Sequence, residues 1–72
     1  MPKVPILKPK ELVSVLLKMG FVEKRQTGSH LILFNPITKK ITTVPIHIKT
    51  VGKGLLLAII KQAGIDVNKI LK

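Results

Sequence analysis

The chain has only 72 residues and no cysteine, and these two facts constrain its fold more than any other feature. A chain this short buries only about 60% of the surface that its unfolded form exposes. Disulfides and thiolate zinc sites, which often stabilise small domains, are excluded. Stability must come from dense aliphatic packing, from a partner, or from both. Hydrophobic residues make up 46% of the sequence, so we expect one globular domain over residues 1–72.

The charge is strongly unbalanced. Thirteen Lys and Arg residues against 3 acidic residues give a formal net charge of +10. A surface this basic repels itself, so the imbalance indicates a polyanionic partner. Nucleic acid is the leading candidate, and a membrane surface or an acidic protein is the second. The alternative is a lysine-rich surface without such a partner, although surfaces of that kind usually balance lysine with glutamate.

Two sequence features bear on location. The first ten residues contain lysines and prolines but no apolar segment typical of a signal peptide. The longest apolar run, residues 55–60, is far too short to span a bilayer. We therefore expect no membrane partner, and the absence of cysteine suits a cytoplasmic protein.

Hydrophobic periodicity divides the chain into five elements. Helical patterns cover residues 10–19 and 54–63, with Leu56, Ile59, Ile60 and Ala63 as the core stripe of the second. Strand patterns cover residues 21–26, 29–34 and 41–46. Pro9 suits the first turn of the first helix, and Gly20 and Gly64 are placed to end the two helices.

The element order α-β-β-β-α predicts an α+β fold. Three strands joined by short turns imply a three-stranded antiparallel sheet, and the two helices should pack together on one of its faces. This is the layout of the double-stranded-RNA-binding domain. Asp66 is expected to cap a short final turn over residues 67–71. Because a fold does not define a function, the site must be argued from its residues.

Most catalytic motifs are missing from this sequence. There is no phosphate-binding glycine loop, no cysteine nucleophile and no metal-ligand cluster, so we expect neither a cofactor nor a metal. The acids Glu11, Glu23 and Asp66 lie on different elements, which argues against a pair of catalytic carboxylates. Histidine, which takes or gives a proton near neutral pH, is the remaining candidate acid or base.

His30 follows Gly28 and Ser29, where a turn leads into the second strand. Glycine permits close approach of a ligand, and Ser29 can donate to a phosphate oxygen. His30 is then a candidate base for a ribose 2′-hydroxyl, with lysines stabilising the developing charge. His47, just past the third strand, is a candidate second proton-transfer group or phosphate contact. On residue chemistry alone, a surface histidine without function is the more common situation for both.

Several basic residues lie near the predicted turns and are candidate phosphate contacts. Aromatic residues are almost absent, and Phe21 and Phe34 both fit the core, so recognition of backbone and shape is favoured over base stacking. Any single one of these basic residues is more often just solvated. The candidates are Lys24, Arg25, Lys39, Lys40, Lys49 and Lys53.

An exposed apolar patch is also predicted. Leu57 lies between Lys53 and Lys61 on the polar face of the second helix. Leu31 and Leu33 share the face of the second strand opposite His30. Together the three leucines predict contact with a second copy of the chain or with another protein. The alternative is one stray surface leucine, which is common.

Four motifs occur in a specific order along the chain, and as an ordered set they resemble the HicA toxin family over residues 10–65. The resemblance implies a fold like the double-stranded-RNA-binding domain and a ribosome-independent mRNA interferase. It implies a HicB-like antitoxin as partner, which masks the active site. The family's catalytic histidine corresponds to His30, and its second recurrent histidine to His47. The motifs are Gly20-Phe21, Gly28-Ser29-His30, Val44-Pro45-Ile46-His47 and Lys61-Gln62-Ala63-Gly64-Ile65.

The chain departs from the family at Leu31, where a polar residue is common. It also departs at Leu55 and Leu57, where threonine and a basic residue are common. Weak activity, altered substrate choice and a degenerate copy are all consistent with these changes. Charge and fold suit a histidine-dependent endoribonuclease, a non-catalytic RNA-binding module, and an antitoxin-bound or dimeric protein without activity. Only the Gly28-Ser29-His30 motif favours the endoribonuclease.

Overall fold

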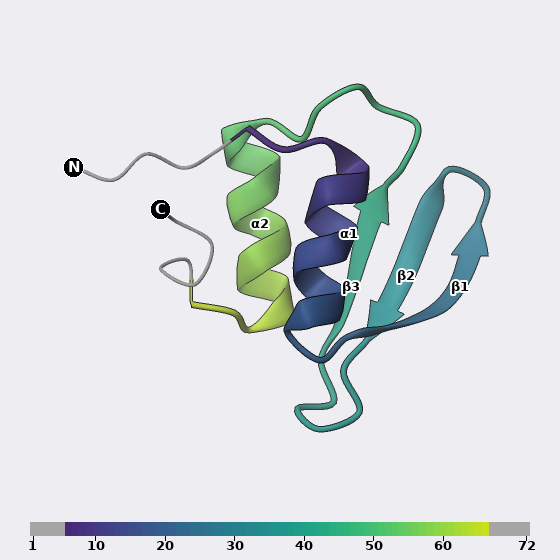
Figure 1. The fold of residues 1–72 in the computed structure, drawn as a ribbon, viewed down its shortest axis with the longest axis vertical. Coiled ribbons are helices and arrows are strands. Elements are labelled where there is room, and N and C mark those ends of the chain that lie inside the picture. Colours follow the sequence, from purple (N-terminus) through teal and green to yellow (C-terminus); the bar gives the residue numbers. More distant parts are fainter. Residues whose placement is uncertain (1–5, 67–72) are drawn as a thin grey trace.

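The computed structural model describes residues 6–66 of the chain, and the final turn expected over residues 67–71 lies outside them. The order of elements is α-β-β-β-α, as predicted (Figure 1). The three strands form one antiparallel sheet in the order β1-β2-β3, so β2 is central. The elements are α1 (Pro9–Lys18), β1 (Val22–Thr27), β2 (His30–Phe34), β3 (Ile41–Pro45) and α2 (Lys53–Ala63).

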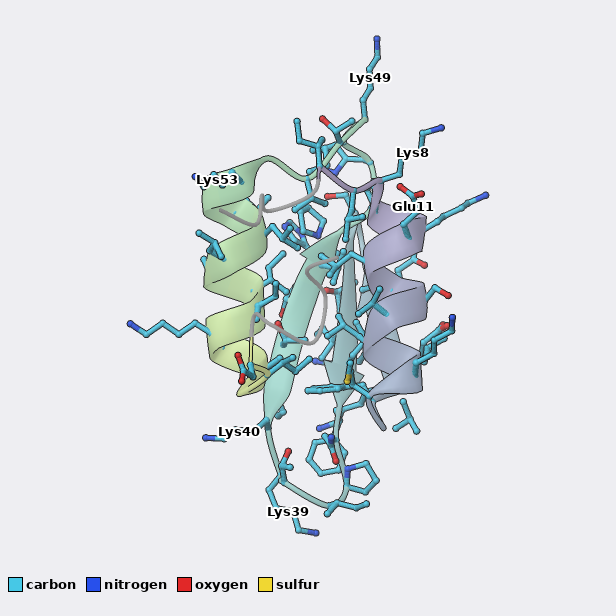
Figure 2. The ribbon with its side chains drawn as sticks, turned by 60° about the vertical axis from the view of Figure 1, so that its left-hand side comes forward. Lys8, Glu11, Lys39, Lys40, Lys49 and Lys53 are labelled. Atoms are coloured by element: carbon cyan, nitrogen blue, oxygen red, sulfur yellow. The ribbon has the colours of Figure 1, made fainter. Side chains whose placement is uncertain are left out.

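Both helices pack on the same face of the sheet, and Figure 2 shows them side by side with the sheet behind them. Their apolar stripes meet alternate residues of β2 and β3, which are buried, whereas every residue of β1 is exposed. The core stripe predicted for α2 is confirmed. The core consists of Leu12, Leu16, Phe21, Leu31, Leu33, Val44, Val51, Leu56, Ile59, Ile60 and Ala63.

The limits of α1 follow from its terminal residues. Pro9 occupies the first turn, where a missing N–H costs nothing. The Glu11 carboxylate accepts a hydrogen bond of 2.8 Å from the backbone N–H of Lys8, which satisfies a donor at the helix start. Gly20, with φ of 99°, turns the chain out of the helix in a conformation that favours glycine. Leu17 is 43% exposed, because the buried stripe of α1 runs through Pro9, Leu12 and Leu16 and leaves Leu17 to one side.

Asn35 ties the end of α1 to the turn between β2 and β3. Its side chain is buried, and Oδ1 accepts hydrogen bonds from the N–H groups of Ile37 (2.9 Å) and Thr38 (3.2 Å). Its Nδ2 lies 3.4 Å from the carbonyl oxygen of Met19, to which it donates. This asparagine therefore folds the turn locally and holds it against the helix.

A backbone hydrogen bond joins the start of the described chain to the segment before α2. The N–H of Val51 donates to the carbonyl of Leu7 over 2.6 Å, as part of an isolated antiparallel bridge. Val51 is fully buried, and Leu7 packs against the same core. The loop between β3 and α2 is therefore anchored to the core just before the start of α2.

The predicted apolar patch is wrong for two of its three leucines. Leu31 and Leu33 are 8% and 0% exposed, because the face of β2 that carries them is the face that the helices cover. Leu57 is 36% exposed, so contact of Leu57 with a partner stays a prediction. In the described part of the chain, no helix is long and apolar enough to cross a membrane.

Adjacent leucines on α2 allow a matched test of this packing. Leu56 is fully buried, and Leu57 projects to the surface. We expect Leu56→Ala to lower the free energy of unfolding by roughly 2–5 kcal/mol, because it leaves a cavity in a thin core. Leu57→Ala should change it by less than about 0.5 kcal/mol. Urea unfolding followed by circular dichroism measures both, and equal effects would contradict the assigned orientation of α2.

Candidate active site

The face of the sheet opposite the helices carries the residues of chemical interest, and we call it the outer face. Directly paired residues of an antiparallel sheet point to the same side, so strand register assigns its members. His30 pairs with Thr27 on β1 and with Pro45 on β3. The other members are Arg25, Ile32 and Thr43 in the next row and Val22, Phe34 and Ile41 in the last.

The turn before His30 is a two-residue hairpin loop, Gly28-Ser29, between β1 and β2. Gly28 has φ of 59°, and glycine at the first position of such a loop matches the twist of the paired strands. A Cβ atom placed on Gly28 would meet nothing within 4 Å, so the turn is open to approach from that side. His30 follows it directly and is exposed.

Pro45 lies opposite His30, at a position where the ladder needs no donor. The next N–H along the chain, that of Ile46, donates to the carbonyl of Ser29 over 2.8 Å. Proline is tolerated here because β3 is an edge strand and the pairing skips its nitrogen. The ladder thus continues one residue beyond β3, which brings the following residue close to His30.

His47 is that residue, and the structure brings the two histidines together. Their ring centroids are 6.4 Å apart, with an angle of 69° between the ring planes. Both side chains are exposed. Ile46 and Ile48, on either side of His47, pack against the core, so the intervening histidine points outward. The two imidazoles therefore share one open surface although they come from different segments.

The basic residues divide between the two ends of the sheet. The hairpin loop at Gly28 and the segment from β3 to α2 lie at one end, and the β2–β3 turn lies at the other (Figure 1). Figure 2 places Lys49 and Lys53 at the first end, with Lys8 nearby. It places Lys39 and Lys40 at the far end. The structure therefore does not bring these last two candidates to His30.

Lys24 and Arg25 take different positions on β1. The Lys24 ammonium lies 5.6 Å from the ring centroid of Phe34, whose end of β2 is remote from His30. Arg25 pairs with Ile32, so it lies one row from His30 on the same face. Of the predicted phosphate contacts, Lys24 and Arg25 both share the outer face with the histidines, but Arg25 is the nearer to His30. Lys53 lies at the histidine end of the sheet.

Sequence reasoning missed two lysines at this end. Lys8 and Lys10 line a groove together with Lys49, beside the half-buried side chains of Ile46 and Ile48. Their position depends on how the start of α1 docks beside the segment after β3, which no local pattern predicts. Thr27, the cross-strand neighbour of His30, was also missed, but the two-residue loop at Gly28 signals that pairing.

The histidine site is an open surface. The cavity of about 340 Å³ that Val13, Leu31 and Ile46 help to line lies on the helix side of the sheet. An open surface fits a segment of polymer better than an enclosed small molecule. Among the described residues, no group of three or more histidine, cysteine or acidic side chains is placed to hold a metal ion.

The fold and the site together define a small basic α+β domain with two histidines on the sheet face that its two helices leave open. The family described as "HicA toxin of bacterial toxin-antitoxin" has a model that matches residues 9–65 of the 72-residue chain. The chain therefore belongs to the HicA toxin family, as its motifs predicted. Membership implies that it pairs with a HicB antitoxin. A search of curated proteins finds no match to the chain.

The burial of Leu31 changes the meaning of one departure from the family pattern. This side chain faces the helices and is 8% exposed, so it takes no polar group away from the outer face. Leu55 and Leu57 lie on the exposed side of α2, at 41% and 36% exposure. Any effect of the departures on substrate contact would therefore come from α2 and not from the strand that carries His30.

Proposed function

We propose that this toxin is an endoribonuclease that cleaves mRNA, with His30 as a catalytic residue. The observation that carries the proposal is the position of His30, exposed at the start of the central strand on a face that the helices leave open. A general base must reach the proton that it removes, and an imidazole on an open face can reach the sugar of an RNA strand lying across the sheet.

In the proposed reaction, His30 accepts the proton of a ribose 2′-hydroxyl, and the oxygen attacks the adjacent phosphorus. We assign to Arg25, one row away on the same face, a contact with a non-bridging oxygen as negative charge develops there. Gly28 and Ser29 form the turn beside the histidine, where the Ser29 hydroxyl is available to a phosphate. These roles rest on protein groups alone, so we expect cleavage to proceed in the presence of a chelator.

The same geometry suggests how the HicB antitoxin acts. A partner that covers the outer face would bury His30 and Arg25 and exclude RNA from them. The side chains of Ile32 and Phe34 give such a partner an apolar surface to pack on, and both are half-buried. We therefore place the antitoxin over the outer face, with RNA and antitoxin competing for it.

Substitution of His30 tests its catalytic role. Removal of general-base help should slow cleavage by roughly 10²–10⁴-fold. We expect purified His30→Ala to show that loss on an mRNA substrate, and its expression should no longer arrest bacterial growth. Because His30 is exposed, the variant should fold as the wild type does, which thermal unfolding checks. Equal cleavage by both proteins would remove His30 from catalysis. RNA binding by the wild type without any cleavage would leave a non-catalytic binding module.

Charge substitutions at the two ends of the sheet test where RNA binds. Arg25→Gln should weaken binding to an uncleavable 2′-O-methyl RNA and reduce the salt dependence of affinity by about 0.7 in the log–log slope, as expected for one lost phosphate contact. The matched control is Lys39→Asn, which removes one charge at the far end. Lys39 has φ of 65°, a conformation that asparagine tolerates. If Lys39→Asn weakens RNA binding as much as Arg25→Gln does, RNA does not bind preferentially at the histidine end of the sheet.

A further inference from the structure

We propose that His47 is a second catalytic residue, which donates a proton to the departing 5′-oxygen while His30 removes the proton of the 2′-hydroxyl. This inference rests on the proposed ribonuclease function. Its starting observation is that two exposed imidazoles from different segments lie 6.4 Å apart, centroid to centroid, on one face of the sheet.

The separation of the rings suits a group held between them. At 6.4 Å between centroids, the ring nitrogens cannot come within the roughly 2.7–3.2 Å of a direct hydrogen bond. The angle of 69° also rules out a stacked pair. Neither imidazole therefore satisfies the other, and both keep their ring nitrogens available for a bound ligand.

Cleavage by the 2′-hydroxyl needs two proton transfers on opposite sides of one phosphorus. The attacking and leaving oxygens of a phosphoryl transfer lie roughly in line, so one side chain beside the 2′-oxygen cannot also reach the 5′-oxygen. A second group across the phosphate must protonate the leaving oxygen. His47 is placed across a gap from His30, as this reaction requires.

The step balances without any further reactant. The 2′-oxygen loses its proton to neutral His30 and forms a bond to phosphorus. The bond between phosphorus and the 5′-oxygen breaks, and that oxygen takes a proton from the His47 imidazolium. The products are a 2′,3′-cyclic phosphate and a 5′-hydroxyl, with His30 protonated and His47 neutral. Proton exchange with water restores the starting states.

No described carboxyl group competes for this role. Glu11 accepts a hydrogen bond from Lys8 at the start of α1. Glu23 pairs with the fully buried Leu33, so it lies on the helix side of the sheet. Asp66 follows Gly64, which lies against the side chain of Lys40 at the far end of the sheet.

The backbone around His47 is anchored, which a catalytic position needs. Ile46 is held by its hydrogen bond to the carbonyl of Ser29, directly beside His30 in sequence. Ile48 packs on the core, and Val51 donates to the carbonyl of Leu7 a few residues later. These contacts fix the segment on both sides of the histidine without using its imidazole. Positioning of this kind keeps a catalytic group in a productive geometry.

A substrate with a better leaving group tests the assignment. In one oligonucleotide the 5′-oxygen at the cleavage position is replaced by sulfur, whose thiolate departs without a proton; the other oligonucleotide has the natural oxygen. We expect His47→Ala to cleave the oxygen substrate roughly 10²–10⁴-fold more slowly than the wild type. On the sulfur substrate its rate should return to within about tenfold of the wild-type rate. His30→Ala should stay slow on both substrates, because the 2′-hydroxyl still needs a base.

The outcomes are distinct. If His47→Ala is equally slow on both substrates, His47 contacts the phosphate or the RNA chain and is not the acid, which overturns the inference. Wild-type speed of His47→Ala on the oxygen substrate also overturns it. If the wild type cleaves neither substrate, the proposed ribonuclease function itself fails. His47 is exposed, so the variant should fold, and its thermal unfolding compared with His30→Ala provides the control.

Discussion

The burial of one face of the sheet against two helices is the constraint on which the rest of the structure depends. Leu33 and Val44 are fully buried on that face, and the stripes of α1 and α2 complete the core around them. Side chains alternate along a strand, so burying Leu31 and Leu33 sends His30 to the opposite side. A thin core without disulfides thus sets both the stability of the domain and the direction of its candidate catalytic residue.

The register of the strands determines which residues come together on the outer face. The Gly28-Ser29 loop pairs Thr27 with His30, and the hydrogen bond from Ile46 to Ser29 carries the pairing past Pro45. A slip of one residue would bury the histidine and expose the leucines beside it, at a large cost in apolar burial. His47 therefore lies close to His30 because the strand register that buries the leucines also fixes the positions of both histidines.

Most of the fold could be predicted from local patterns, but the assembly of the site could not. The alternation of side chains along a strand placed His30 and Leu31 on opposite faces of the sheet. It does not say which face the helices cover. The prediction of an apolar surface patch that included Leu31 and Leu33 was wrong for that reason. The far position of Lys39 likewise follows from the topology and not from its neighbours in sequence. The proximity of His30 and His47 depends on strand register together with an anchored loop.

The central claim is that RNA lies on the outer face, against both histidines. Its most direct test is a titration of the labelled protein with 2′-O-methyl RNA, followed through the ring Hε1 resonances of His30 and His47 by NMR. The account predicts that both resonances shift in one saturable process with a common Kd, while amide resonances on the exposed side of α2 stay in place. Shifts confined to α1 and α2, with both histidine resonances unchanged, would contradict it.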